Sequence, residues 1–212
     1  MGRVVVRRTR TDAAATREAI LDAAEQEFLE RGVSRTSLEH IAQRAQVTRG
    51  AIYWHFKDKN DLFSAMIDRV RLPMSDIAAA YRQRETSDDP LEMLQQFCRL
   101  ALAKLDENET YRNVYTILIT RCEFSGEVNP AFHRQLAIDA ENLRQVEADF
   151  CHALELGLLA EHVEPRVVTR ALYSLMHGIY VSWLRAPSSF QVREDGEAML
   201  ELFFAGLRRR EA

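Results

Sequence analysis

Apolar residues recur along this chain every three or four positions, in stretches separated by short polar turns. Such spacing places them on one side of a helix, and no alternation typical of a strand persists. The pattern predicts an all-α fold with an N-terminal three-helix head and a larger C-terminal helical body. We place the head at residues 10–57 and the body at residues 58–212, joined by a helix that begins near Asp58.

The head shows the spacing of a helix-turn-helix. Gly32 is placed to end a first helix, and a second begins in "TSLEHIAQRA", where Thr36 and Glu39 have capping-box spacing. Only "AQV" separates it from a third helix over about residues 48–55, which Thr48 can cap. We therefore expect a recognition helix at 48–55.

Prolines and glycines delimit the helices of the body. The expected helices cover about residues 90–107, 110–122, 130–156 and 192–208, and one more lies in the proline-bounded stretch 164–187.

The third helix of the head has two faces of different chemistry. Ile52 and Phe56 are four residues apart, so they can share the face that packs inward. The other face carries an arginine, a glycine and two further aromatic rings, Tyr53 and Trp54. Since the inner face already supplies the core, we expect both rings to be partly exposed.

The outer face of this helix suits the major groove of double-stranded DNA. Arginine binds the N7 and O6 acceptors of guanine, and Gly50 and Ala51 keep the helix thin enough to approach the bases. Helix N-termini and hydroxyl groups favour phosphate oxygens. The expected DNA contacts are Thr36, Ser37, Thr48, Arg49, Gly50, Ala51, Tyr53, Trp54, His55 and Lys59.

Charge is divided unevenly along the 212 residues. The net charge is −4, but residues 1–60 carry +3 and the remainder −7, so we expect only the head to bind a polyanion. The start lacks an export signal and no segment is apolar enough for a membrane span, so we expect a cytoplasmic protein without a membrane partner. Three widely spaced cysteines fit a reducing compartment.

A continuous stretch of about 60 residues resembles the TetR family of bacterial repressors. It comprises "TREAILDAAEQEFLERG", "TSLEHIAQRAQV" and "TRGAIYWHFKDKNDLF". The later fragments "DPLE", "RCEF", "WL" and "APSSF" are similar to the AcrR-type subgroup, which represses multidrug efflux pump genes. The resemblance implies an all-α homodimer, an effector pocket among the body helices, and DNA contacts at Thr36, Arg49, Gly50, Tyr53, Trp54, His55 and Lys59.

One position departs from the family pattern. Gln46 occupies the turn where the family often has glycine. A side chain at this position has to accept a positive φ, which costs about 1 kcal/mol.

The last two helices are the expected dimer interface. "ALYSLMHGIYVSWL" and "AMLELFFAGL" are apolar or small around much of their circumference. Paired with their symmetry mates they would form a four-helix interface, and a dimer is what reads a palindromic operator. The alternative is that these helices form the core of a monomer.

Apolar stripes with isolated polar groups predict a cavity for a hydrophobic small-molecule effector. Ordinary core packing is the alternative for each residue. The expected lining is Leu94, Phe97, Cys98, Tyr115, Leu118, Ile119, Asp139, Asn142, Val146, Tyr173, Met176, His177 and Tyr180.

These features together predict a transcriptional repressor of an efflux pump operon that hydrophobic compounds release from its operator. Two alternatives remain open: a DNA-binding regulator without an effector, and a redox sensor using Cys98, Cys122 or Cys151. Histidines never fall at metal-ligand spacing with a second ligand, and Cys151, His152 and Asp149 point apart on one helix. We expect no metal site, no cofactor and no enzymatic activity.

Overall fold

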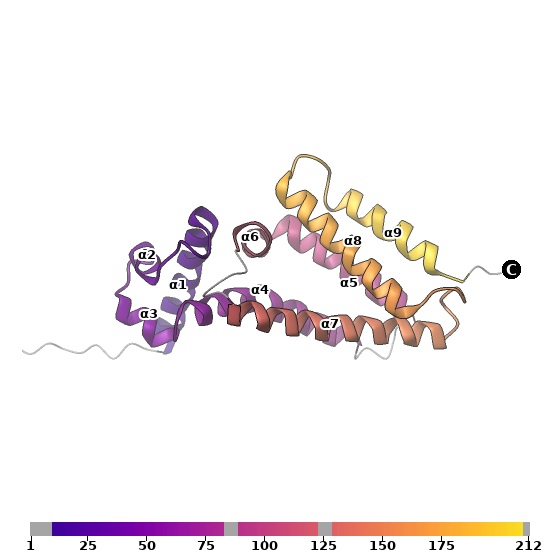
Figure 1. Ribbon diagram of the computed structural model, residues 1–212, viewed down its shortest axis with the longest axis horizontal. Helices are drawn as coiled ribbons and strands as arrows, with labels where there is room; N and C mark the ends of the chain where they lie inside the picture. The colour runs from indigo at the N-terminus through magenta and orange to yellow at the C-terminus, as the bar shows by residue number, and fades with distance from the viewer. Residues whose placement is uncertain (1–9, 83–88, 123–128, 210–212) are drawn as a thin grey trace, which may run out of the picture. The chain divides into compact units, whose positions relative to one another are not determined.

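The computed structural model describes residues 10–82, 89–122 and 129–209. Throughout these ranges the regular structure is helical, without a strand, in agreement with the expected all-α class. Figure 1 shows the helices in chain order. Their bounds are α1 (Arg10–Arg31), α2 (Leu38–Arg44), α3 (Arg49–His55), α4 (Lys59–Arg82), α5 (Pro90–Glu107), α6 (Glu109–Thr116), a π-helical turn η1 (Ile117–Arg121), α7 (Asn129–Glu155), α8 (Pro165–Arg185) and α9 (Glu194–Leu207).

The chain forms two compact units. Unit 1 comprises Met1–Arg69 and Asn113–Phe132, and unit 2 comprises Val70–Arg112 and His133–Ala212. Helices α4 and α6 each run from one unit into the other. The functional boundary expected between residues 57 and 58 stays a prediction. The first boundary between the compact units lies later, after Arg69, because the first half of α4 packs with the head.

Unit 1 is organised around aromatic side chains of α1 and α4. Phe28 and Phe63 are both buried, and their rings meet edge to face with centroids 5.7 Å apart. Gly32 ends α1 with φ +83°, a conformation that favours glycine. The next residue, Val33, donates its backbone N–H to the carbonyl of Arg121 at 3.1 Å. The end of η1 therefore belongs to the packing of the head.

Unit 2 is built on α5, which packs against both α8 and α9. A Cβ added at Gly196 of α9 would lie 2.7 Å from Leu102 Cδ1 of α5, so glycine allows these helices to approach closely. Arg99 pairs with Glu201 at 2.9 Å across the same contact. On α8, the Tyr180 hydroxyl donates to the carbonyl of Ala101 at 3.3 Å.

Candidate nucleic-acid interface and effector site

Helix α3 has a buried side and an exposed side, as its sequence predicted. Ile52 is fully buried, and Phe56, the C-cap residue of α3, is 2% exposed. Tyr53 is 49% exposed and Trp54 is 72% exposed, which confirms the expected exposure of both rings. The hydroxyl of Thr48 accepts the backbone N–H of Ala51 at 3.1 Å, so Thr48 caps the helix as expected.

Arg49 and Tyr53 form a pair on the exposed side. Arg49 Nη2 donates to Tyr53 Oη at 3.2 Å, and the guanidinium lies 5.5 Å from the centre of the tyrosine ring. The residues are one helical turn apart, which allows this contact. The arginine is thus held against α3 with its other N–H groups available to an outside acceptor.

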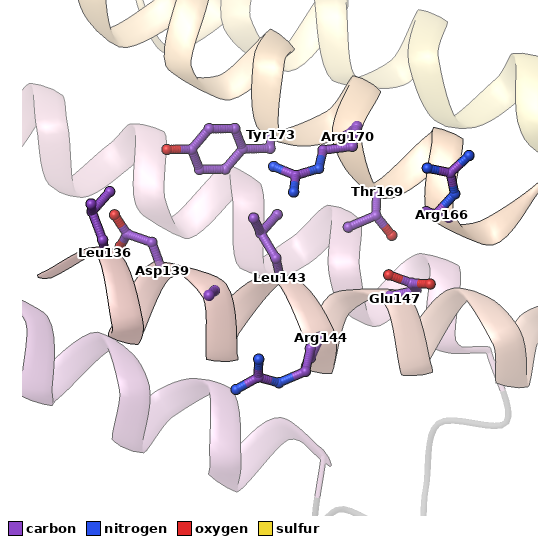
Figure 2. A pocket seen from close by; sticks show the side chains of 10 residues that line it. Leu136, Asp139, Leu143, Arg144, Glu147, Arg166, Thr169, Arg170 and Tyr173 are labelled. Carbon is purple, nitrogen blue, oxygen red and sulfur yellow. The ribbon is translucent and has the colours of Figure 1, made fainter. Parts of the chain in front are cut away.

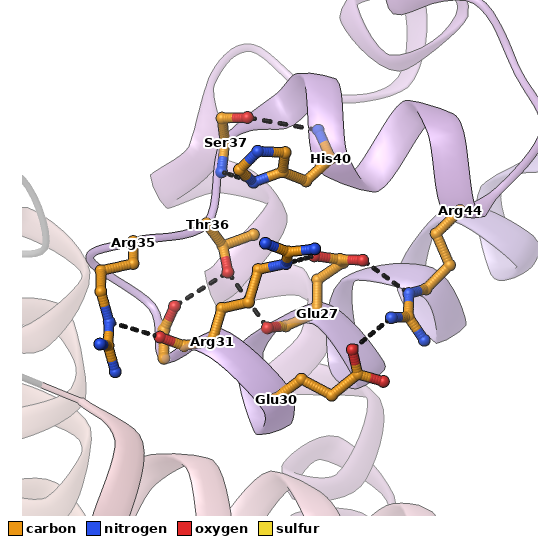
Figure 3. A network of polar contacts seen from close by, with 9 residues as sticks. Glu27, Glu30, Arg31, Arg35, Thr36, Ser37, His40 and Arg44 are labelled. Carbon is orange, nitrogen blue, oxygen red and sulfur yellow. Dashed lines mark hydrogen bonds and ion pairs between the residues drawn. The ribbon is translucent and has the colours of Figure 1, made fainter.

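The N-terminus of α2 is capped by a different pair from the one expected. Ser37, not Thr36, is the N-cap: its hydroxyl accepts from His40 N at 3.2 Å, and its own N–H donates to His40 Nδ1 at 3.3 Å. Figure 3 shows both bonds. The expected Thr36–Glu39 capping box is wrong by one position, because histidine can serve as the acceptor at the third helical position. Ser37 is exposed at this end of α2.

Two side chains that were expected to contact phosphates instead form hydrogen bonds within unit 1. Thr36 is 2% exposed, and its hydroxyl bonds the carbonyls of Glu27 (3.1 Å) and Gly32 (2.9 Å), as drawn in Figure 3. This burial is incompatible with the phosphate contact expected from its side chain. Lys59 Nζ donates to the carbonyls of Val33 and Thr36, so it fastens the start of α4 to the α1–α2 turn. Neither side chain is therefore assigned as a DNA contact.

The turn between α2 and α3 has the expected strained residue. Gln46 has φ +54°, as predicted from the departure from glycine at this position. The other expected contacts, Gly50, Ala51 and His55, lie on α3; Gly50 is exposed, and the rings of His55 and Trp54 meet edge to face at 4.5 Å.

A buried carboxylate holds α1 to α2. Glu27 accepts from Arg31 Nε and Arg44 Nε, both at 2.7 Å, and Arg44 also bonds Glu30 at 2.5 Å (Figure 3). Burial by itself raises the pKa of Glu27, but the hydrogen bonds and charges of Arg44 and Arg31 outweigh it and lower the pKa. Glu27 is therefore ionised at neutral pH and keeps α2 in place beneath α3.

The residues expected to line an effector pocket are distributed over both units. Tyr115, Leu118 and Ile119 belong to unit 1, and the others to unit 2. Leu94, Cys98 and Tyr180 are buried in the core of unit 2, where the Tyr180 hydroxyl lies 3.0 Å from that of Tyr111. Phe97 and Met176 are partly buried, Val146 is partly buried on α7, and Asn142 and His177 are exposed. Asp139 and Tyr173 both line one groove of unit 2.

This groove, between α7 and α8, has a volume of about 430 Å³, within the range of small-molecule sites. Figure 2 shows Leu136, Asp139, Leu143 and Glu147 of α7 opposite Arg166, Thr169, Arg170 and Tyr173 of α8. Ala140 and Arg144 complete the lining. The wall is thus apolar in its middle and carries charges of both signs.

Two titratable groups of the groove are partly desolvated. Burial raises the pKa of Asp139, although the hydrogen bond from Gln135 and the charge of Arg71 lower it. Burial, and then the charge of Asp139, raise the pKa of Tyr173. Both groups can therefore act as hydrogen-bond partners in a partly water-excluded wall.

On α7, the groove-lining residues could have been predicted from the sequence by choosing a neighbouring set of positions with the same helical spacing. We expected Asp139, Asn142 and Val146 to share the inward face of α7, but the lining residues are 136, 139, 140, 143, 144 and 147. These positions follow helical spacing equally well. Arg166, Thr169 and Arg170 were missed on α8 because charged and hydroxyl side chains do not mark an apolar stripe.

The described residues show no membrane-length apolar helix and no cluster of three His, Cys, Asp or Glu side chains able to hold a metal ion.

Burial raises the pKa of the Cys98 thiol to about 12 and that of the Cys122 thiol to about 11. Neither sulfur is a thiolate at neutral pH, and reactive cysteines are usually thiolates.

Residues 20–66 match the family model of bacterial regulatory proteins of the tetR family, and residues 89–208 match the C-terminal region of MAATS-type transcriptional repressors. The second match spans more than half of the chain. The chain therefore belongs to the TetR family of transcriptional regulators, as the resemblance of its sequence predicted.

Individual relatives are similar over nearly the whole chain. The HTH-type transcriptional repressor BepR of Brucella suis biovar 1 (strain 1330) is 36% identical over 203 residues, which cover 96% of this chain and 97% of BepR. The crystal structure of NalD, the secondary repressor of the MexAB-OprM multidrug efflux pump in Pseudomonas aeruginosa, is 42% identical with a TM-score of 0.84, covering 94% of this chain and all of NalD. SmeT of Stenotrophomonas maltophilia in complex with triclosan is 33% identical with a TM-score of 0.82, covering 92% of each chain.

Proposed function

We propose that this protein is a cytoplasmic repressor of a multidrug efflux pump operon, which hydrophobic small molecules release from a palindromic operator. The observation that carries the proposal is the arrangement of α3. Buried Ile52 and Phe56 anchor the helix, while Arg49, Tyr53 and Trp54 face outward. The repressor names of BepR, NalD and SmeT support the same role.

Arg49 is the residue to which we assign base recognition, because guanidinium binds guanine in two places. Tyr53, Trp54 and His55 flank it for phosphate, sugar and methyl contacts. The N-terminal ends of α2 and α3 present Ser37, Thr48 and Ala51, where anions are favoured.

Gly50 supports a close approach by an outside body. Its φ is not in the left-handed region, and a Cβ there would only meet Thr48 Oγ1, at an ordinary 3.8 Å. Glycine inside a helix costs up to about 1 kcal/mol relative to alanine. Since packing within unit 1 does not require glycine here, we assign the space to DNA.

Dimerisation through α8 and α9 is supported by small and apolar side chains that unit 2 leaves exposed. Leu202 is 78% exposed and Val167 is 53% exposed. A Cβ added at Gly178 or Gly206 would meet no atom within 4 Å, so a second copy could approach both helices closely. Two heads related by a twofold axis would read the two halves of a palindrome.

The groove between α7 and α8 is the proposed effector site. Leu136, Ala140 and Leu143 supply apolar surface, and Asp139 and Tyr173 supply polar partners. The triclosan complex of SmeT supports a small, aromatic, largely apolar effector for a protein of this shape.

A binding experiment on the DNA upstream of the protein's own gene tests the DNA-binding part. We expect a salt-sensitive complex that unrelated DNA does not displace. Arg49→Ala should lower specific affinity about 10- to 100-fold and leave nonspecific affinity nearly unchanged. Equal loss of both would contradict the assigned role of Arg49.

Release distinguishes the proposal from its two alternatives. Adding triclosan, dyes or bile salts to the complex should displace the operator; a regulator without an effector would stay bound throughout. A redox sensor would respond to oxidant and lose that response when all three cysteines are changed to serine. The raised pKa values of Cys98 and Cys122 count against this second alternative.

A further inference from the structure

The three arginines that line the groove between α7 and α8 are not equivalent. Arg144 donates from Nε and Nη2 to Glu141 of its own helix, and Figure 2 shows its side chain extending away from α8. Arg166 Nε donates to Glu164 at 3.3 Å. Arg170 forms no hydrogen bond or ion pair within the part of the chain that the structure describes. Its guanidinium therefore has no carboxylate of its own and can serve an anion from outside.

Apolar side chains lie next to the guanidinium of Arg170. Figure 2 shows this side chain reaching from α8 toward Leu143 of α7. Ala140 and the exposed Leu136 continue the same wall of the groove. A carboxylate that binds a guanidinium beside apolar surface competes with less water than it would in open solvent. This part of the groove therefore suits an anion that is attached to an apolar body.

The other end of the groove offers hydrogen-bond partners. Tyr173 lies about one helical turn after Arg170, and Asp139 lies opposite on α7 (Figure 2). Burial raises the pKa of Tyr173, the charge of Asp139 raises it further, and the charge of Arg170 lowers it, so the hydroxyl is within electrostatic range of both charges. A carboxyl group and a phenol can both bond a hydroxyl group of a ligand.

The helix sets the spacing of the two ends. Tyr173 and Arg166 are seven residues apart on α8, which is about 10 Å along the helix, with Arg170 between them. A carboxylate near Arg166 and Arg170 leaves room for two fused rings before Tyr173 is reached, and the volume of about 430 Å³ accommodates them. Glu147 lies on α7 at the Arg166 end (Figure 2), where it offsets one of the two positive charges.

We propose that this groove binds organic anions with a rigid apolar body, a carboxylate at one end and a hydroxyl group at the other. The inference rests on the proposed function and specifies the class of its effector. Arg170 binds the carboxylate, with Arg166 beside it. Leu143 contacts the apolar body, while Asp139 and Tyr173 bond the hydroxyl group. A purely apolar compound leaves these polar groups without a partner, so it binds more weakly.

The probe that tests this class is 6-hydroxy-2-naphthoate, because its fused rings hold a carboxylate and a hydroxyl group at opposite ends. Isothermal titration calorimetry on the full-length protein compares it with its methyl ester, which lacks the anion, and with 2-naphthoate, which lacks the hydroxyl group. The wild type should bind the probe about tenfold more tightly than the ester and about threefold more tightly than 2-naphthoate.

Variants of the groove assign the contacts. Arg170→Gln should weaken binding of the probe about tenfold and leave binding of the ester nearly unchanged, because the ester has no charge to lose. Tyr173→Phe should weaken the probe about threefold and leave 2-naphthoate unchanged. Arg144→Gln is the matched control, since it removes the same charge from the lining but from a side chain already bonded to Glu141. It should bind the probe as the wild type does.

Each outcome is decisive. An ester that binds as tightly as the probe, or a wild type that does not bind the probe at about 1 mM, overturns the ligand class. Equal weakening of the probe and the ester by Arg170→Gln, or equal loss in Arg144→Gln, overturns the assignment to Arg170. Release of the operator separates these failures from that of the proposed function. If triclosan displaces the operator and the probe does not, the ligand class fails and the repressor stands, whereas a protein that binds the probe but no operator contradicts the proposed function alone.

Discussion

At the residue scale, the geometry of Arg49 and Tyr53 prepares the recognition side chain before DNA arrives. An exposed arginine ordinarily samples many rotamers, and fixing it on binding costs free energy. Here the hydrogen bond to Tyr53 and the contact with its ring already restrict the guanidinium. Part of the ordering cost is thereby met in the unbound protein.

Tyr53→Phe tests this preparation, because it removes the hydroxyl and keeps the ring. We expect specific affinity for the operator to fall about fivefold, as one hydrogen bond to a charged group is lost. Fluorescence anisotropy on operator and unrelated duplexes gives the measurement. In an Arg49→Ala background the same change should have a smaller effect, and equal effects in both backgrounds would show that the two side chains act independently.

Gln46 gives a second prediction at this scale. Its φ of +54° is disfavoured for a residue with a Cβ, so Gln46→Gly should raise the melting temperature by about 2 °C. Ala45, the neighbouring C-cap, has φ −73° and is the control. Ala45→Gly should lower the melting temperature, because glycine gains nothing there and loses more entropy. A fall for Gln46→Gly would mean that its side chain contributes more than its backbone costs.

Residue roles could be predicted where they depend on near neighbours in the chain. The cap at Thr48, the buried Ile52 and the strain at Gln46 follow from local spacing and backbone geometry. Thr36 and Lys59 could not be assigned in this way. Their partners are carbonyl groups up to 26 residues away, and a hydroxyl or ammonium that suits phosphate suits a carbonyl equally well.

At the element scale, helical periodicity predicted the order and approximate ends of the helices, since apolar stripes and proline or glycine breaks are written locally. The sequence could not predict which set of α7 side chains faces the groove, because that depends on where α8 lies. The π-helical turn after α6 also had no sequence signal. The carbonyl of its last residue, Arg121, accepts the backbone N–H of Val33, which follows α1, and this long-range contact is seen only in the folded unit.

The junction of α1 with α2 provides a prediction with a defined pH dependence. The pKa of Glu27 is lowered in the folded protein, so its ionised form stabilises the fold above the pKa of the unfolded chain, and this contribution is lost as the pH falls through the folded pKa. Glu27→Gln should therefore cost about 1 kcal/mol at neutral pH, since the arginine partners are partly exposed.

Urea unfolding midpoints, measured from neutral pH down to about pH 3, check this dependence. The difference between the wild type and Glu27→Gln should shrink in acid. Glu141→Gln is the control: Glu141 also bonds an arginine, Arg144, but both are exposed on α7 and little stability should change. A difference for Glu27→Gln that stays constant across the pH range would mean that the charge of Glu27 does not stabilise the fold.

At the scale of the whole molecule, charge is divided along the chain as the proposed function requires. The first 60 residues carry a net charge of +3 and the rest −7, so the remainder of the chain repels DNA while the head is attracted. One head covers too few base pairs to select a single operator in a genome. The affinity of the proposed repressor must then depend on holding two heads together, and α8 and α9 have the exposed surface to do so.

Leu202→Arg should separate the proposed dimer. The side chain is 78% exposed on α9, so the change leaves the core of unit 2 intact but would bury a charge in the interface. Light scattering after size exclusion at about 10 µM should give the mass of a monomer, and operator affinity should fall at least about 100-fold. Leu156→Arg, at a leucine that is 48% exposed outside α8 and α9, should leave both mass and affinity unchanged. A Leu202→Arg protein that keeps the mass of a dimer would place the interface elsewhere, and one that becomes a monomer yet binds the operator as tightly as the wild type would show that a single head suffices.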